Sequence, residues 1–409
     1  MNRIIAILIT LPMVLHLCAQ TTDQQAVDVV SGTVVDERTG RPIAQATVSV
    51  DGTSIAVVTN DDGYFTLKNA SAAKGITVSY VGYQSKHLKA PASRITLVPT
   101  AIPLNEVVVW TEDPHQLVSI AIRKIPNNYS RQPELFQGFY RETAMKRQHY
   151  IYVAEAVVDM YKTSYTHNDS RDRVAIRKGR RLLSAKQGDT LTVKVMGGPV
   201  LPIQLDVVKN PDLLLSVEEL NNYNFEMQPT TTIDNRLQYV VDISPRWPMP
   251  WPLYFGRLYI DRETLAFTRV ELRLDVSDRE KATNYMLVRR PPGVRFRPRE
   301  LSTLIDYRYD QGVTRISYIR NIFRFNCDWR RKLFATSFTA CCEMVFTDHQ
   351  PATNGRPISG RDSFDSRDNF YDKVSYFLDP LFWEDYNIIE PSTSLDQAID
   401  KLLKKKLRN

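Results

Sequence analysis

The sequence predicts a mainly β protein, in which a small N-terminal β-sandwich precedes an α+β domain with a curved antiparallel sheet and a C-terminal helix. Between residues 30 and 99, short alternating runs are separated by turn residues, as in a sandwich. Between residues 237 and 275, apolar and charged residues alternate as in half-solvated antiparallel strands. Residues 394–406 place their apolar side chains at helical spacing.

The chain begins with a segment typical of a secretory signal peptide, predicted over residues 1–20. Arg3 precedes an apolar run, residues 4–17, that is too short to span a bilayer comfortably. Cys18 raises the alternative of a lipoprotein. Because Leu17 is not the small residue that a lipobox requires, simple cleavage is favoured. We therefore expect an exported protein, periplasmic or associated with the outer membrane, without a transmembrane span in the mature chain.

The chain is basic, with a formal net charge of +7 and a pI of about 9.1. An exported chain does not routinely meet nucleic acid, so no nucleic-acid partner is expected. Anionic lipid or glycan surfaces are better candidates, as is another envelope protein. A solvated basic surface without a partner explains the charge equally well.

Three cysteines follow the predicted signal peptide, and an odd number does not form a complete disulfide framework. Apparent strands flank the sequence "DWRRK", so a hairpin there would place Cys341 opposite about Asn321. The separation from Cys327 is then about 20 Å, whereas a disulfide needs Cα atoms within about 7 Å. Cys327, Cys341 and Cys342 are therefore all expected to be reduced.

The N-terminal region contains six runs that fit short strands: "SGTVVD", "ATVSVDG", "SIAVVTN", "YFTLKN", "ITVSYVGY" and "RITLVP". The segment "VVTNDDGYFTL" holds two adjacent acidic residues. As an EF-hand loop with Gly63 in its sixth position, it would have Val58 first and Asn69 twelfth, and neither supplies the required carboxylate. Asp61 and Asp62 would point to opposite faces of an extended chain, which excludes an acid/base pair. A tight turn is predicted.

Several motifs occur together in this region: Gly32-x-Val34-x-Asp36, Gly40, Pro42-Ile43, Ala46-x-Val48, Gly52-Thr53, Thr59-x-Asp61-x-Gly63-x-Phe65 and "SYVGYQ". With them, the segment resembles the carboxypeptidase-regulatory-like domain. The resemblance implies a seven-stranded, prealbumin-like β-sandwich, expected over residues 28–100. Such domains are common in the cell envelope of Bacteroidota, usually at the N-terminus of a larger protein. It implies a structural or docking module and no catalysis.

Residues 101–113 are predicted to be a linker. Their "LNEVVV" is similar to the segment that leads from this sandwich into the plug and barrel of TonB-dependent receptors. Only about 300 residues follow, too few for a plug and a 22-stranded barrel with roughly 10 residues per strand. The sequence also ends "LLKKKLRN", which is a basic helical tail and not a lipid-facing strand. A receptor of this class is therefore not expected.

Residues 114–409 are predicted to form an antiparallel-sheet α+β domain of unknown function. The segment "DPHQLVSIAIRKIPNNY" has a helical pattern that Pro126 ends. Residues 136–165 fit two strands, or a strand and a helix, whereas residues 164–181 are polar and charged, as in a loop. "GRLYIDRETLAFTRV" reads as a hairpin, and Ser394 begins a capping box at the start of the last helix. The pattern resembles uncharacterised envelope proteins of Bacteroidota with the same sandwich and is loosely similar to lipoprotein-carrier folds.

The sequence lacks the common hydrolase and metal-site motifs. No His is followed three residues later by Glu, as zinc carboxypeptidases require, and His-Glu-x-x-His, Gly-x-Ser-x-Gly and phosphate-loop motifs are absent. The match of Ser71–Lys74 to Ser-x-x-Lys is short enough to arise by chance. Cys342 and His349 would lie roughly 20 Å apart on an extended strand. No catalytic residue, metal or cofactor is therefore expected.

The stretch "SPRWPMPWPLYFG" is unusual, because four prolines alternate with Trp247, Trp251, Tyr254 and Phe255. Such a segment cannot pair as a central strand. One interpretation is the rim of an apolar cleft, enclosed by the hairpins and the C-terminal helix, that meets a glycan or a lipid headgroup. The other interpretation, which is the commoner case, is a stiff crossover whose aromatic rings fill the core.

These patterns predict a non-enzymatic envelope protein, with a sandwich for docking and a sheet domain that binds a partner or an apolar ligand. The alternative is a periplasmic hydrolase with an unrecognised active site. A pocket with two or more carboxylates, or with a His–carboxylate pair, would favour the hydrolase. A pocket lined only by apolar side chains would favour a carrier.

Overall fold

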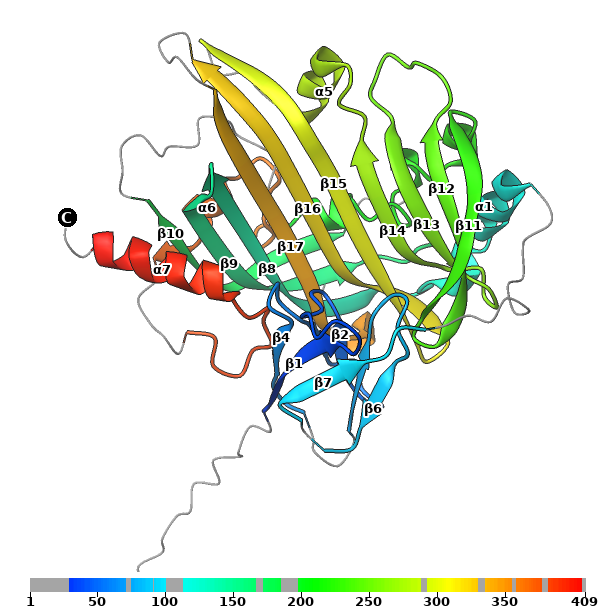
Figure 1. Cartoon of the computed structure of the whole chain (residues 1–409), viewed down its shortest axis with the longest axis horizontal. Helices are drawn as coiled ribbons and strands as arrows, with labels where there is room; N and C mark the ends of the chain where they lie inside the picture. Colours follow the sequence, from blue (N-terminus) through cyan, green and yellow to red (C-terminus); the bar gives the residue numbers. More distant parts are fainter. Residues whose placement is uncertain are drawn as a thin grey trace, which may run out of the picture.

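The computed structural model describes residues 29–70, 75–90, 92–100, 113–166, 172–184, 198–287, 293–329, 335–354, 358–376 and 382–406. The predicted signal peptide, nearly all of the predicted linker and the Ser71–Lys74 motif lie outside these residues. Figure 1 shows a small sandwich, coloured blue, below a large curved sheet. No helix in the described ranges is long and apolar enough to cross a membrane.

The sandwich contains the seven strands that the resemblance implies. Three strands form one sheet in the order β4-β1-β7, and four form the other in the order β3-β2-β5-β6. The strands are β1 (Val30–Asp36), β2 (Thr47–Val50), β3 (Ala56–Val58), β4 (Tyr64–Leu67), β5 (Ile76–Ser79), β6 (Lys86–Leu88) and β7 (Arg94–Leu97). Buried apolar side chains fill the space between the sheets. The sequence did not predict strand β6, because its side chains are exposed or half-exposed and do not alternate between apolar and polar.

The acidic segment between β3 and β4 is a tight turn, as predicted. The Asn60 Oδ1 atom accepts hydrogen bonds of 2.9 Å from the backbone N–H groups of Asp62 and Tyr64. Gly63 has φ +72°, and a Cβ there would lie 2.5 Å from the Val34 carbonyl oxygen. The turn therefore requires glycine for its backbone angle and for its close approach to β1.

The second domain is built on one eleven-stranded sheet in the order β11-β12-β13-β14-β15-β16-β17-β8-β9-β10-β18. All neighbours pair antiparallel except β18, which runs parallel to β10. The strands are β8 (Glu134–Lys146), β9 (His149–Lys162), β10 (Arg173–Leu183), β11 (Tyr223–Ile233), β12 (Arg236–Pro245), β13 (Tyr254–Asp261), β14 (Phe267–Leu274), β15 (Val294–Asp310), β16 (Val313–Trp329), β17 (Thr336–Pro351) and β18 (Ser375–Tyr376).

Two segments that the sequence left open or misassigned are strands. The region with two interpretations forms the pair β8 and β9, without a helix. The loop predicted for residues 164–181 is wrong in its second half, because Arg173–Leu183 forms β10. This strand has only β18 beyond it, so several of its basic side chains stay at the surface and hide the apolar alternation.

Short helices cover the inner face of the sheet, defined as the face that carries Val158, Val241 and Ile305. They pack with these residues in the largest apolar cluster. The helices are α1 (Pro114–Arg123), α2 (Ile125–Asn128), α3 (Leu201–Gln204), α4 (Val217–Leu220), α5 (Arg279–Met286) and α6 (Phe370–Lys373), with 3-10 turns at Pro211–Leu213 and Ala352–Asn354. Helix α1 lies in the predicted segment, and the Asp113 side chain accepts from the His115 N–H. The prediction that Pro126 ends this helix is wrong, because α1 ends at Arg123 and Pro126 lies in α2.

The C-terminal helix α7 (Thr393–Lys406) lies on the opposite, outer face. Its buried side chains contact Val153 and Leu182 on β9 and β10: Leu395, Ile399 and Leu402. The carbonyl of Ser392 accepts the first helical hydrogen bond, so the cap is Ser392, two residues before the predicted cap at Ser394. The sequence predicted a cleft between this helix and the Trp247–Phe255 crossover, and that prediction is wrong. The crossover joins β12 to β13, which lie in another part of the sheet from β9 and β10 (Figure 1).

The sandwich is fixed to the outer face at several points. Val58 packs in one cluster with Phe139, Val157 and Trp383. The Gly82 N–H donates to the Thr232 carbonyl over 2.8 Å. One side of the sandwich is therefore covered by the sheet domain of the same chain.

Candidate functional site

The structure separates the four aromatic residues singled out in the sequence. Trp247, Trp251 and Phe255 are 53%, 46% and 38% exposed, whereas Tyr254 is only 8% exposed. The Tyr254 side chain turns toward the inner face, and its hydroxyl lies 2.8 Å from that of Tyr285. The interpretation as a core-filling crossover thus describes Tyr254, and it does not describe the two tryptophans.

The crossover is held rigidly in its exposed position. Its prolines fix φ and remove N–H groups, so the segment has little freedom to collapse onto the sheet. The Lys281 Nζ atom on α5 donates to the Met249 carbonyl over 2.8 Å and ties the crossover to the helix. The Arg246 guanidinium lies over the Trp247 ring, 4.7 Å from its centroid.

A pocket of about 420 Å³ lies between the crossover and α5. Trp251 and Tyr285 line it, with Asp278, Glu280 and Lys281 among the polar side chains. Asp278 caps α5, and hydrogen bonds from the backbone N–H groups of Lys281 and Glu280 hold its pKa below the usual value. Sequence reasoning missed Tyr285, which is 44% exposed, because a single tyrosine on a polar helix carries no periodic signal.

A second depression, of about 750 Å³, lies on the outer face of β11 to β14. Phe255 forms part of its wall, and the Arg273 guanidinium lies 5.7 Å from the centre of that ring. Arg257 and Asp242 form a two-point ion pair across it, with distances of 2.6 and 2.9 Å. The groove is therefore polar, and it does not match the apolar pocket of a carrier.

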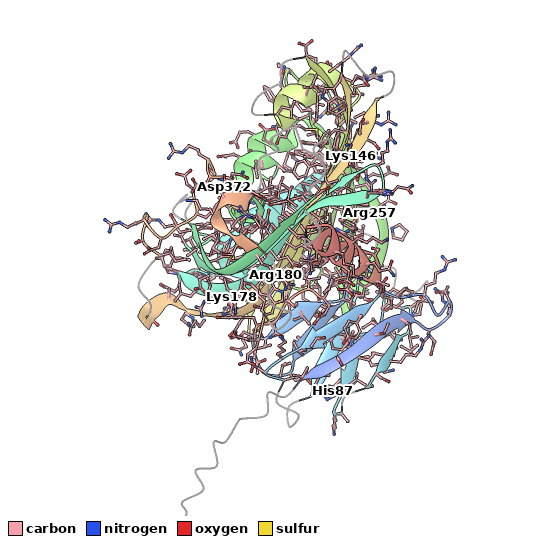
Figure 2. All side chains as sticks on the ribbon, turned by 90° about the vertical axis from the view of Figure 1, so that its left-hand side faces the viewer. His87, Lys146, Lys178, Arg180, Arg257 and Asp372 are labelled. Atoms are coloured by element: carbon pink, nitrogen blue, oxygen red, sulfur yellow. The ribbon has the colours of Figure 1, made fainter. Side chains whose placement is uncertain are left out.

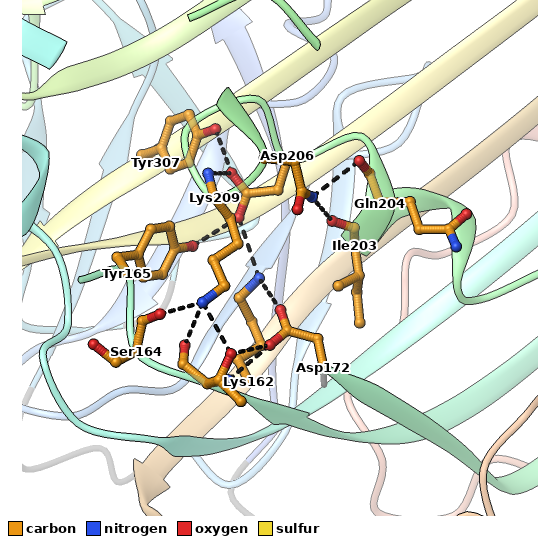
Figure 3. Close-up of polar contacts among 11 residues, drawn as sticks. Lys162, Ser164, Tyr165, Asp172, Ile203, Gln204, Asp206, Lys209 and Tyr307 are labelled. Carbon is orange, nitrogen blue, oxygen red and sulfur yellow. Dashed lines mark hydrogen bonds and ion pairs between the residues drawn. The ribbon is translucent and has the colours of Figure 1, made fainter. Parts of the chain in front are cut away.

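The most enzyme-like group of side chains is closed. In Figure 3, Lys162, Tyr165 and Tyr307 point at the buried Asp206, whose carboxylate accepts over 3.1, 2.7 and 2.8 Å. Burial lowers the pKa of Lys162, but Asp206 and Asp172 outweigh burial and raise it. The hydrogen bonds from Lys162 and Tyr307 tie the loop after α3 to β9 and β15, and the bond from Tyr165 ties it to the segment after β9. Neither of the two pockets described above includes this cluster.

A second charged cluster lies on the outer face. Glu155 accepts from Arg141 over 2.7 Å and from Arg180 over 3.0 Å. Burial raises the pKa of Glu155, but the two guanidinium charges prevail and hold it below its usual range. Arg141 also donates to the Ile389 carbonyl over 2.5 Å. Figure 2 shows Arg180 beside Lys178 on the flank of the sheet above the sandwich. Because Ile389 lies just before α7, its bond to Arg141 ties that part of the chain to the cluster.

The cysteines are free thiols, as predicted. Cys342, and not Cys341, lies opposite Asn321, so the expected hairpin register is one residue off. Burial raises the pKa of Cys342 well above its usual value. His349 lies seven residues further along the same strand, where its ring packs against Phe136. Among the described residues, no three His, Cys, Asp or Glu side chains are grouped to hold a metal.

Comparisons with known proteins identify only the N-terminal part of the chain. Several solved structures are similar to parts of it. A DUF1329 family protein from Desulfovibrio piger has 7% identity and a TM-score of 0.26 and covers 60% of this chain and 96% of its own. A putative outer membrane lipoprotein-sorting protein domain from Vibrio parahaemolyticus has 9% identity and a TM-score of 0.26, with 60% and 95% covered. MucB in complex with MucA has 13% identity and a TM-score of 0.19, with 58% and 99% covered.

These scores are too low to transfer a function, and no curated protein matches the chain. A family model matches residues 30–109, which extends nine residues beyond the predicted end of the sandwich at residue 100. The N-terminal sandwich is therefore a CarboxypepD_reg-like domain.

Proposed function

We propose that this chain is a non-enzymatic binding protein of the cell envelope, exported to the periplasm or associated with the outer membrane. The sandwich is a module fixed to the sheet domain. The Trp247–Phe255 crossover is the binding rim. The alternative, a periplasmic hydrolase, would need an accessible set of reactive side chains, and the Asp206 cluster is enclosed and fully hydrogen-bonded.

One observation carries the proposal: two tryptophans are exposed on a single proline-stiffened segment. Tryptophan is normally largely buried, so two exposed rings in one short segment need an explanation. Exposed Trp, Tyr and Arg side chains held in fixed positions are the usual anchors of a binding surface. The crossover supplies the two tryptophans and, beside them, Arg246, and α5 supplies Tyr285.

The test compares the mature chain with its Trp247→Ala/Trp251→Ala variant in co-sedimentation with isolated cell envelopes. We expect the variant to bind at least about tenfold more weakly, because anchor tryptophans typically contribute about 2 kcal/mol or more. A matched control, Tyr64→Ala/Tyr309→Ala, removes two exposed rings elsewhere and should bind as the parent does. Thermal unfolding establishes that each variant is folded.

Equal retention of the tryptophan variant and the parent would contradict the proposal. The hydrolase would replace it if the purified chain turned over peptides or esters. A single Asp, Glu or His substitution would then have to abolish that turnover without loss of fold.

A further inference from the structure

We infer that the partner is a membrane surface containing anionic lipids, bound through its headgroup layer; this rests on the proposed function and specifies its partner. The binding surface, called here the aromatic end, consists of the exposed rings of Trp247, Trp251, Phe255 and Tyr285 with the basic side chains beside them. Among the ten exposed large apolar side chains of the described residues, these four come from one end of the sheet. Trp251 and Tyr285 line one pocket, and Trp247 and Phe255 each lie four residues from Trp251 in the chain, so these residues are not scattered singly.

Cations accompany the exposed rings of the aromatic end. Arg246 lies over Trp247, Arg273 lies beside Phe255, and Lys281 lines the pocket between Trp251 and Tyr285. Trp and Tyr prefer the headgroup level of a bilayer, where basic side chains meet lipid phosphates. Arg, Trp and Tyr are also enriched at protein interfaces, whereas Lys is depleted there. The excess of Arg and Lys over acidic side chains is therefore what favours an anionic membrane surface over a protein partner.

The charge of this end is complementary to anionic lipid. The segments 246–255, 273–287 and 293–299 contain seven Arg or Lys residues against three Asp or Glu residues. One of the three acids, Asp278, is engaged as the cap of α5, and one of the seven bases, Arg297, forms an ion pair with Asp328. Arg279, Arg295 and Arg299 are exposed and belong to α5 and β15, which pack together.

The position of the aromatic end allows it to reach a flat surface. In Figure 1, α5 and the tips of β13 and β14 lie at the top of the molecule, and the sandwich lies at the bottom. The sandwich contacts the β11–β12 turn, where the Ser85 N–H donates to the Asn235 side chain over 2.8 Å, and the cluster around Val58 and Trp383. The sandwich therefore leaves the aromatic end uncovered.

The experiment measures sedimentation of the mature chain with two vesicle types, phosphatidylcholine alone and phosphatidylcholine mixed with phosphatidylglycerol. We expect binding to the mixed vesicles, a shift of tryptophan emission to shorter wavelength, and loss of binding at high salt. The Arg246→Ser/Arg279→Ser variant should bind about fivefold more weakly for each charge removed. The control Arg38→Ser/Arg94→Ser removes the same charge from the sandwich and should change binding little.

Two results would overturn the inference and leave the proposed function standing. In one, the parent binds lipid-free peptidoglycan or envelope protein but not the mixed vesicles. In the other, vesicle binding is equally reduced by the arginine variant of the sandwich, which would indicate a nonspecific charge effect. Failure to bind whole envelopes would contradict both proposals. The emission shift of the parent tests the inference even if a variant does not fold.

Discussion

At the scale of single residues, Asp62 shows how a turn residue gains a second role. Its carboxylate accepts from the backbone N–H and the hydroxyl of Thr393, over 2.6 and 2.7 Å, at the start of α7. The sequence predicted the turn, because Asn, Asp and Gly have local preferences. The partner could not be predicted, since it is 331 residues away in the sequence.

We predict that Asp62→Ala lowers the free energy of unfolding by about 1 kcal/mol, because it removes a cap from the first turn of α7. Chemical denaturation measures this change, and Glu37→Ala, an exposed acid in the sandwich, serves as the control.

In the parent and in Asp61→Asn/Asp62→Asn, the thermal midpoint should not change with calcium or EDTA. A calcium-dependent midpoint in the parent would contradict the assignment as a structural turn.

Glu142 predicts a pH dependence of stability. Burial raises its pKa, while hydrogen bonds from the Tyr140 hydroxyl and the Gly198 N–H oppose this effect. Because the pKa of Glu142 is higher in the folded than in the unfolded protein, its protonated form stabilises the fold, fully so below the unfolded pKa of about 4.3. This stabilisation is lost as the pH rises through the pKa of the folded protein. Glu142→Gln should therefore match the parent in acid and be the more stable protein at neutral pH. Denaturant unfolding across that range is the measurement, and a stability difference independent of pH would contradict the assignment.

At the scale of elements, the sequence was most informative where one face of a strand or helix is solvated. The buried face of α7 is the predicted one, and the alternating hairpin of β13 and β14 is also present. Strand β10 was missed because basic side chains on an outlying strand resemble a loop. Arg269, expected on a solvated face, is buried, because Asp306 pairs with it at 3.0 Å and Tyr80 of the sandwich lies beside it. Such contacts between distant segments leave no local pattern.

We predict that Ile399→Ala lowers the free energy of unfolding by about 2–4 kcal/mol, because it opens a cavity between α7 and β9. Lys401→Ala, on the exposed side of the same helix, should change it by less than about 0.5 kcal/mol. Urea denaturation provides both values. Similar effects of the two substitutions would show that α7 is not packed on the sheet as described.

At the scale of the whole molecule, the sandwich and the sheet domain share a buried apolar cluster, so we expect them to unfold as one unit. Val58→Asp should uncouple them, because it places a charge among Trp383, Phe139 and Ile388. We expect scanning calorimetry to show one transition for the parent and two for this variant. The control Val98→Asp lies on the exposed surface of the sandwich and should retain one transition. Two transitions in the parent would contradict the coupling.

The candidate site was predictable only in part at this scale. The alternation of proline and tryptophan marked the right segment, but only the fold shows which rings are exposed and brings Tyr285 and the basic residues of α5 beside them. The expected cleft between the crossover and the C-terminal helix did not form, because α7 packs on β9 and β10 in another part of the sheet.

The most direct test of the central claim is hydrogen–deuterium exchange of the mature chain with and without isolated cell envelopes. Binding at the aromatic end should slow exchange in peptides covering residues 246–255 and 279–287, because contact and ordering protect their amides. Peptides of the sandwich and of the loop that carries Asp206 should exchange as in the free protein. Protection centred on the Asp206 loop, with no change at the crossover, would contradict the account.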